Sequence, residues 1–111
     1  MAGVEDRIDF RPGPALQTLR ALEPELQFDF AFIDAEKTEY EAYYELILSR
    51  VRPNGLILFD NMLWSGRVGR DAAWDAKGHA IDALNRKLPK DPRVEVMLLP
   101  IADGVLICRK L

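Results

Sequence analysis

Two apolar runs that each end at an aspartate constrain this 111-residue chain more than any other feature. Residues 28–33 (Phe-Asp-Phe-Ala-Phe-Ile) precede Asp34, and residues 56–59 (Leu-Ile-Leu-Phe) precede Asp60. Short apolar runs of this kind are typical of buried strands. The segment between them carries helix-spaced apolar residues, namely Tyr40, Tyr43, Tyr44, Ile47, Leu48 and Val51. The pattern predicts a β-α-β unit with two parallel, neighbouring strands.

The rest of the chain continues this alternation of strands and helices. The expected elements are a weak strand at 7–10, a helix from 15 to 22, a helix opened by a Thr38–Glu41 capping box, a turn at 53–55, a long loop at 61–73, a helix from about 75 to 88, and a closing hairpin of strands 94–99 and 105–109. Alternation of this kind predicts an α/β layer fold, and the length suits a single domain over residues 1–111.

Composition and charge narrow the class of protein. Hydrophobic residues make up 49% of the chain and charged residues 30%, which is typical of one folded domain. The formal net charge of −3 argues against a general nucleic-acid binder, because phosphate contacts require an excess of Lys and Arg. The sequence has neither a leader peptide nor an apolar run near the ~20 residues of a membrane span, so we expect a cytoplasmic protein without a membrane partner.

The two strand-end aspartates are the first candidate site. Neighbouring parallel strands lie about 4.8 Å apart, so Asp34 and Asp60 are expected side by side at the carboxyl edge of the sheet, with Asn61 adding an amide oxygen. An all-oxygen ligand set of this kind suits Mg²⁺, Ca²⁺ or Mn²⁺ better than zinc. The alternative is that each aspartate only caps the helix or turn that follows it.

Two further residues have both a functional and an ordinary interpretation. Lys37 follows Asp34 by three residues and reaches the same edge. It is either a general base whose pKa is lowered by nearby metal charge, or a solvated surface lysine. Trp64, in the long loop, either walls a substrate pocket or packs against the body of the protein or a second subunit.

Several ordered motifs resemble the cation-dependent O-methyltransferases of the catechol and caffeoyl-CoA type. The matching segments are residues 28–37, 52–57, 60–68, 91–94 and 98–104, together with Tyr40, Tyr43 and Tyr44. The resemblance covers almost the whole chain. It implies the C-terminal part of a Rossmann-like methyltransferase sheet, with parallel strands flanked by helices and closed by an antiparallel hairpin.

The resemblance also implies an activity, which is methyl transfer from S-adenosylmethionine to a hydroxyl of a phenolic, catechol-like small molecule with a divalent metal ion such as Mg²⁺. Residue by residue, it implies Lys37 as the catalytic lysine, Asp34, Asp60 and Asn61 as metal ligands, Ala15, Asp34 and Glu36 as cofactor-binding residues, and Ser65 and Trp64 as substrate contacts. Glu36 stands where the family usually has aspartate.

One departure from the family pattern is large. The chain corresponds only to the second part of the methyltransferase domain, and no glycine-rich strand-to-helix turn that would bind the cofactor occurs in it. In the family's sheet order, two further strands lie between the third and fourth, so the strand at 28–33 is expected to have an uncovered edge. Such an edge predicts either a homodimer or re-pairing of residues 7–10 against it.

Three functions remain open at this point. The first is a metal-dependent O-methyltransferase in truncated form. The second is a non-catalytic metal-binding or dimerising module derived from such an enzyme. The third is a metal-dependent hydrolase that uses Asp34, Asp60 and Asn61 to activate water, which no phosphate-cradling loop supports.

Overall fold

The computed structural model describes residues 3–62 and 76–111. Its elements are the 3₁₀ helix η1 (Glu5–Arg7), α1 (Ala15–Ala21), β1 (Phe28–Ile33), η2 (Lys37–Glu39), α2 (Tyr40–Leu48), β2 (Val51–Phe59), α3 (Ala76–Lys87), η3 (Leu88–Lys90), β3 (Val94–Leu99) and β4 (Val105–Lys110). Among these described helices, none has the length and apolar character needed to cross a membrane.

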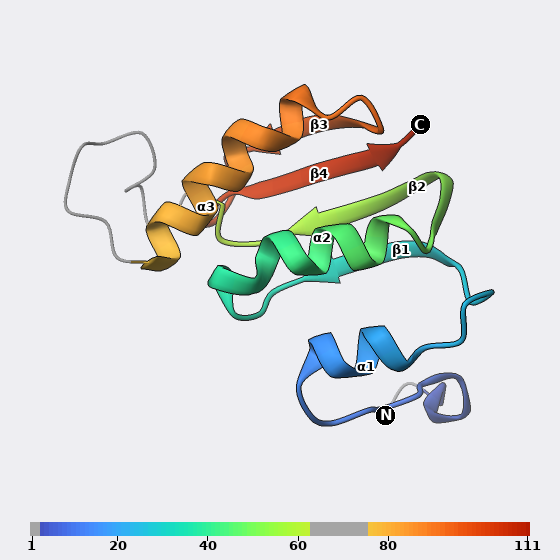
Figure 1. Ribbon diagram of the computed structural model, residues 1–111. Coiled ribbons are helices and arrows are strands. Elements are labelled where there is room, and N and C mark those ends of the chain that lie inside the picture. Colours follow the sequence, from blue (N-terminus) through green and yellow to red (C-terminus); the bar gives the residue numbers. More distant parts are fainter. Residues whose placement is uncertain (1–2, 63–75) are drawn as a thin grey trace.

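The four strands form one mixed sheet in the order β1-β2-β4-β3 (Figure 1). β1 and β2 are parallel, whereas β4 is antiparallel to both β2 and β3. The predicted α/β fold, its parallel strand pair and its closing hairpin are therefore confirmed. The pairing of Ile33 with Phe59 places the carboxyl ends of β1 and β2 level with each other.

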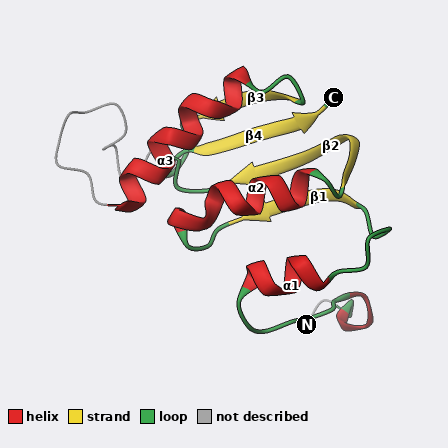
Figure 2. Ribbon diagram, in the orientation of Figure 1, coloured by secondary structure: helices red, strands yellow, loops and turns green. Residues whose placement is uncertain are grey.

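Helices α2 and α3 cover one face of the sheet, and α1 lies beyond α2 (Figure 2). The side chains that meet these helices alternate along the strands, as in the paired row Ile33, Phe59 and Leu106, all of which are buried. Tyr40 and Tyr44 of α2 pack against the Phe59 ring, with centroids 5.4 and 6.2 Å away. The helical spacing of these two tyrosines therefore places both rings in the hydrophobic core.

The opposite face of the sheet is more open. Phe30 and Phe32 of β1 are each 54% exposed, and Met97 of β3 is 60% exposed. In the part of the chain that the structure describes, α2 and α3 both lie on the other side of the sheet (Figure 1). β1 is also one of the two edge strands of the described sheet, the other being β3.

The predicted turn at 53–55 lies within β2. Val51 pairs with Phe28 and Leu56 pairs with Phe30, so residues 52–55 lie opposite Asp29 alone and form a bulge. A Cβ added to Gly55 would stand 2.9 Å from the backbone oxygens of both Arg52 and Asp29. A glycine is therefore required here, because the bulge brings backbone against backbone.

Two local predictions are wrong. Residues 7–10 form no strand; they are exposed, and the backbone hydrogen bonds that a strand needs have no partner in the described sheet. Thr38 and Glu41 form no capping box, because η2 precedes α2. Glu36 caps this segment instead, accepting hydrogen bonds from the Thr38 backbone nitrogen (3.4 Å) and hydroxyl (3.1 Å).

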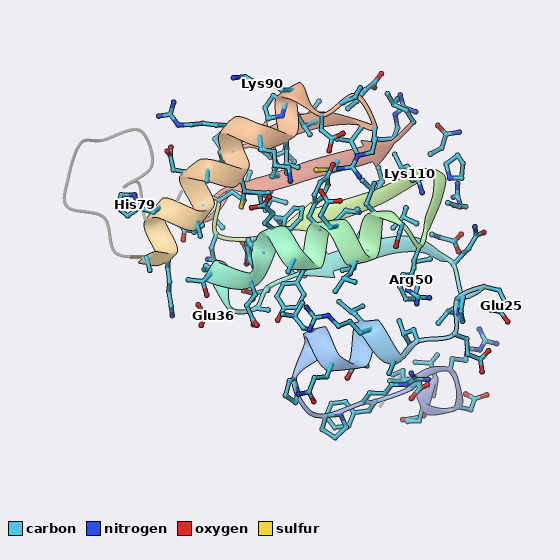
Figure 3. The ribbon with its side chains drawn as sticks, in the orientation of Figure 1. Glu25, Glu36, Arg50, His79, Lys90 and Lys110 are labelled. Atoms are coloured by element: carbon cyan, nitrogen blue, oxygen red, sulfur yellow. The ribbon has the colours of Figure 1, made fainter. Side chains whose placement is uncertain are left out.

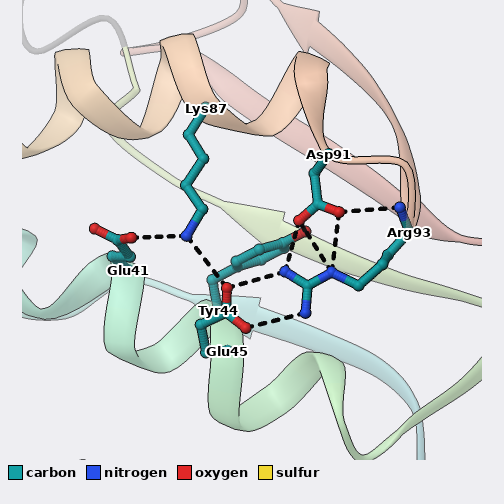
Figure 4. A network of polar contacts seen from close by, with 6 residues as sticks. All are labelled: Glu41, Tyr44, Glu45, Lys87, Asp91 and Arg93. Carbon is teal, nitrogen blue, oxygen red and sulfur yellow. Dashed lines mark hydrogen bonds and ion pairs between the residues drawn. The ribbon is translucent and has the colours of Figure 1, made fainter.

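A polar network ties α2 to the segment that leads into β3 (Figure 4). Asp91, whose side chain is only 6% exposed, accepts hydrogen bonds from the Tyr44 hydroxyl at 2.7 Å and from the Arg93 guanidinium. The same guanidinium also donates to Glu45. Hydrogen bonding from Arg93 holds the pKa of Asp91 well below its usual range, despite the opposing effect of burial. The carboxylate therefore stays ionised inside the network.

We expect Asp91→Ala to lower the free energy of unfolding by about 1–3 kcal/mol at pH 7, because the hydroxyl of the buried Tyr44 loses a charged acceptor. Asp29→Ala, which removes an exposed carboxylate paired with Arg52, is the control and should change it by less than about 0.5 kcal/mol. Urea unfolding monitored by circular dichroism measures both.

The same pair of proteins gives a pH test. Because the folded-state pKa of Asp91 is lowered, its contribution is complete above the unfolded-state pKa near 3.8 and is lost as pH falls below it. The difference in the free energy of unfolding between wild type and Asp91→Ala should therefore become smaller as the pH is lowered below about 3.8. A difference that grows as pH falls would contradict this assignment.

Candidate functional site

The carboxyl ends of β1 and β2 bring the two predicted aspartates to the same edge of the sheet. Asp34 follows Ile33, and Asp60 follows Phe59, the residue with which Ile33 pairs. The Asp60 backbone nitrogen also donates to the Ile33 carbonyl at 3.0 Å, so the pairing continues to the base of the site. The structure thus places both carboxylates at adjacent strand ends, as the β-α-β pattern predicts.

Lys37 lies under this edge and is buried, with 8% of the residue exposed. Its Nζ donates to Asp34 Oδ1 (3.1 Å), the Ala35 carbonyl (2.9 Å) and the Tyr40 hydroxyl (2.8 Å). The interpretation of Lys37 as a solvated surface lysine is therefore wrong. Three acceptors hold the amine beside Asp34.

The electrostatics of Lys37 are set by opposing effects. Burial alone would lower the pKa of the amine, but hydrogen bonds to Tyr40 and Asp34 outweigh it, and the pKa is raised. The protein's own groups therefore favour the charged ammonium, which pairs with the Asp34 carboxylate.

Tyr40 is a site residue that the sequence pattern identifies only as part of the core. Its ring is fully buried, yet its hydroxyl accepts from Lys37 and donates to the Asp60 carbonyl at 3.0 Å. Burial raises the pKa of the Tyr40 phenol more than the neighbouring Lys37 lowers it, so the hydroxyl keeps its proton. Tyr40 therefore links the amine to the end of β2. The i to i+3 spacing from Lys37 is the sequence signal that could have indicated this contact.

Asn61 supplies the third polar side chain at the edge. Its backbone nitrogen donates to Asp60 Oδ1 at 2.7 Å, and its φ of 61° is a left-handed conformation that asparagine tolerates well. The side-chain Nδ2 donates to Asp103 Oδ2 at 3.1 Å, which leaves Oδ1 as the atom able to meet a cation. Asp103, on the turn between β3 and β4, is a second residue that the predictions missed.

The donor chemistry of this edge fits a hard divalent cation. Asp34, Asp60 and Asn61 offer two carboxylates and an amide oxygen, the ligand types that Mg²⁺, Ca²⁺ and Mn²⁺ prefer. Within the described ranges, 3–62 and 76–111, no group of three or more His, Cys, Asp or Glu side chains is arranged to hold a metal. The fit therefore depends on the amide of Asn61 in addition to the two acids.

A pocket of about 290 Å³ lies beside this edge, between α1, the end of β1 and α2. Ala15 and Asp34, both predicted cofactor contacts, line it together. Its walls also include Leu19 from α1, Phe32 from β1 and Ile47 from α2. The pocket combines mostly apolar walls with the Asp34 carboxylate and the Arg11 guanidinium. Sites for small organic ligands commonly combine apolar walls with a few polar groups.

Three predicted contacts remain, namely Glu36, Ser65 and Trp64. Glu36 lies just before η2, which leads into α2 (Figure 3), and its carboxylate caps Thr38 and pairs with Lys77 at 3.7 Å. Hydrogen bonding from the Thr38 backbone lowers the pKa of Glu36. Glu36 is not among the described residues that line the pocket. Ser65 and Trp64, the predicted substrate contacts, lie outside the described residues.

Comparisons with known proteins identify one family of relatives that matches almost the whole chain. Residues 1–111 match the family described as O-methyltransferase. The chain is 44% identical over 119 residues to caffeoyl-CoA O-methyltransferase 2 of Zea mays, a match that covers 98% of this chain and 45% of the maize protein. The chain thus spans about half the length of the curated relatives it matches.

Solved structures of similar proteins carry the same fold. A Podospora anserina methyltransferase, solved with S-adenosylhomocysteine bound, superposes with a TM-score of 0.83 at 35% identity, covering 98% of this chain and 51% of that one. The O-methyltransferase from Bacillus cereus, in complex with S-adenosylhomocysteine, gives 0.81 at 30% identity, covering 91% and 49%. The open sheet with its helices is therefore part of a methyltransferase fold, and the chain belongs to the O-methyltransferase family.

Proposed function

We propose that this chain forms the metal-binding and catalytic part of an O-methyltransferase that transfers a methyl group from S-adenosylmethionine to a hydroxyl of a catechol-like molecule. The observation that carries the proposal is the shared position of Asp34. This residue lines the pocket together with Ala15, lies at the strand end next to Asp60, and pairs with the buried Lys37. The Asp34 carboxylate therefore belongs both to the proposed cofactor pocket and to the proposed cation site.

The relatives support the chemistry of donor and acceptor. Two of the similar structures contain S-adenosylhomocysteine, the compound that remains when S-adenosylmethionine has given up its methyl group. The maize relative is named for caffeoyl-CoA, which carries a phenolic ring. We therefore assign the pocket to the methyl donor and expect a phenolic acceptor at the edge beside it.

The residues at the pocket have distinct proposed roles. Ala15 and the apolar walls would bind the flat base of the cofactor. Asp34 would bind the cofactor where the pocket adjoins the proposed cation site. Glu36 stays a predicted cofactor contact, and it follows Ala35, which lines the pocket. Ser65 and Trp64 stay predicted substrate contacts.

Asp34, Asp60 and Asn61 are the residues that would hold a divalent cation such as Mg²⁺. When bound there, the cation would supply a positive charge that makes a neighbouring phenolic hydroxyl more acidic. The proton transfer and the positioning of the amine are assigned to residues of this chain. Lys37 is the residue that would accept the hydroxyl proton. It can do so only as the neutral amine, a form that the positive charge of a nearby cation would favour over the ammonium. Tyr40 would hold the amine in place. The phenolate oxygen then bonds to the methyl carbon as the sulfur–methyl bond breaks, and the rate gain comes from holding the two atoms close together.

A non-catalytic module remains the alternative function, because the chain spans about half the length of its relatives. A module of that kind would bind the metal but not the methyl donor. The edge of β1, with Phe30 exposed beside it, supports a further proposal, that the 111-residue chain forms a homodimer through this strand.

The cofactor assignment predicts that the chain binds S-adenosylhomocysteine in isothermal titration calorimetry, with and without Mg²⁺. Ala15→Phe should weaken binding at least about tenfold, because the larger ring occupies the pocket. Gln17→Phe, which adds the same ring at an exposed position of α1 that does not line the pocket, should bind as wild type does. Metal binding without any S-adenosylhomocysteine binding would favour the non-catalytic module.

The metal assignment predicts that Asp60→Ala weakens Mn²⁺ binding by more than about tenfold, as measured by electron paramagnetic resonance of the free ion. Asp29→Ala removes an equal charge from β1 far from the carboxyl edge and should leave the affinity unchanged. Equal affinities for wild type and Asp60→Ala would show that the cluster is not the metal site.

The dimer proposal predicts a mass of two chains in light scattering coupled to gel filtration at micromolar concentration. Phe30→Lys should shift the protein toward monomer, because charge on an edge strand opposes strand pairing. Ile101→Lys, at an exposed apolar residue in the turn between β3 and β4, is the control. A wild-type monomer whose β1 amides exchange quickly with solvent would contradict the proposal.

A further inference from the structure

The turn between β3 and β4 contacts the loop that follows β2 through a pair of side chains. Asn61 Nδ2 donates to Asp103 Oδ2 at 3.1 Å, and the two residues are both partly buried. A carboxylate only accepts hydrogen bonds, so it selects the amino side of the Asn61 amide. The oxygen of that amide is then the side that remains for another ligand.

Backbone contacts hold this pair in register. The Met62 nitrogen donates to the Gly104 carbonyl at 3.0 Å, one residue along the chain from the Asn61–Asp103 contact on both segments. Asn85 of α3 donates its side-chain amide to the Met62 carbonyl at 2.8 Å. Met62 itself is fully buried. The loop after β2 is therefore clamped between the turn and α3, and Asp103 has little freedom to leave Asn61.

The turn that carries Asp103 has a specific backbone shape. Gly104 has a φ of 86° and Ala102 a φ of 48°, and the Gly104 nitrogen donates to the Ile101 carbonyl at 2.8 Å. Two left-handed residues on either side of Asp103 close the turn tightly. Alanine is an unfavourable choice in that conformation, so the surrounding contacts hold it there.

We propose that Asp103 is a positioning residue for the divalent cation, one that orients the Asn61 amide so that its oxygen, and not its nitrogen, faces the ion held with Asp34 and Asp60. The inference rests on the proposed metal site. Carbonyl and amide oxygens bind cations, whereas the amino group carries partial positive charge and is repelled. Outer residues that orient metal ligands typically change metal affinity by 10–100-fold when they are removed. Asp103 therefore contributes to the site without touching the ion.

The test compares three variants of the 111-residue chain by Mn²⁺ titration. Asp103→Ala removes the acceptor and should weaken Mn²⁺ binding about tenfold, whereas Asp103→Asn keeps an acceptor oxygen and should restore binding to within about threefold of wild type. Glu95→Ala removes the same charge from the same hairpin, away from the turn, and should bind Mn²⁺ as wild type does. Asp103→Ser, whose side chain is too short to reach Asn61, replaces the alanine variant if that protein does not fold.

A second readout needs no metal. In nuclear magnetic resonance spectra of the metal-free protein, the Asn61 side-chain amide protons should shift and exchange faster in Asp103→Ala but not in Asp103→Asn. A role of Asp103 in turn stability alone would change backbone signals and melting temperature without a specific loss of Mn²⁺ affinity.

The outcomes separate the two proposals. Unchanged Mn²⁺ affinity in Asp103→Ala, together with a loss in Asp60→Ala, overturns the positioning role and leaves the metal site in place. Equal losses in Asp103→Ala and Glu95→Ala also overturn it, because they would show a general effect of charge. A wild-type chain that binds no Mn²⁺ overturns the metal site and the positioning role with it.

Discussion

The parallel pairing of β1 with β2 is the interaction on which the rest of the structure depends. Its register sets Ile33 against Phe59, so the residues that follow, Asp34 and Asp60, emerge at one edge. α2 connects the two strands and packs over them, which buries Tyr40 against Phe59. A shift of one residue in this pairing would turn every side chain of the strand to the other face and separate the two acids from the core beneath them.

The candidate site is assembled from short connections around that pairing. Lys37 and Tyr40 come from the β1–α2 connection and the first turn of α2, and their hydrogen bonds join the amine to both strand ends. Polar groups buried in this way must satisfy one another, since unpaired ones would cost stability. The same contacts that stabilise the edge therefore also hold Lys37 beside Asp34. In this part of the molecule, stability and proposed chemistry depend on the same hydrogen bonds.

Most of the fold could be predicted from local pattern, and the failures have identifiable physical causes. The apolar runs and helical spacing indicated β1, β2, α2 and the hairpin, because burial dominates the choice of these residues. Residues 7–10 carry a strand-like pattern but have no partner strand in the described sheet, and strand formation depends on partners that local sequence does not reveal. The bulge at 52–55 looked like a turn because proline, asparagine and glycine serve both purposes.

The sequence by itself determined the α/β class, the two strands that end in acids, the proximity of Asp34 to Asp60 and the family to which the chain belongs. These follow from periodicity and from motifs contiguous in the chain. Only the tertiary structure decided that Lys37 is buried, that a pocket lies between α1, the end of β1 and α2, and that Asp103 contacts Asn61. The pocket and the Asn61–Asp103 contact join segments remote in sequence, so their geometry depends on how the helices and the hairpin pack against the sheet. The hydrogen bonds of Lys37 are local, but its burial depends on the same packing, which no local pattern encodes.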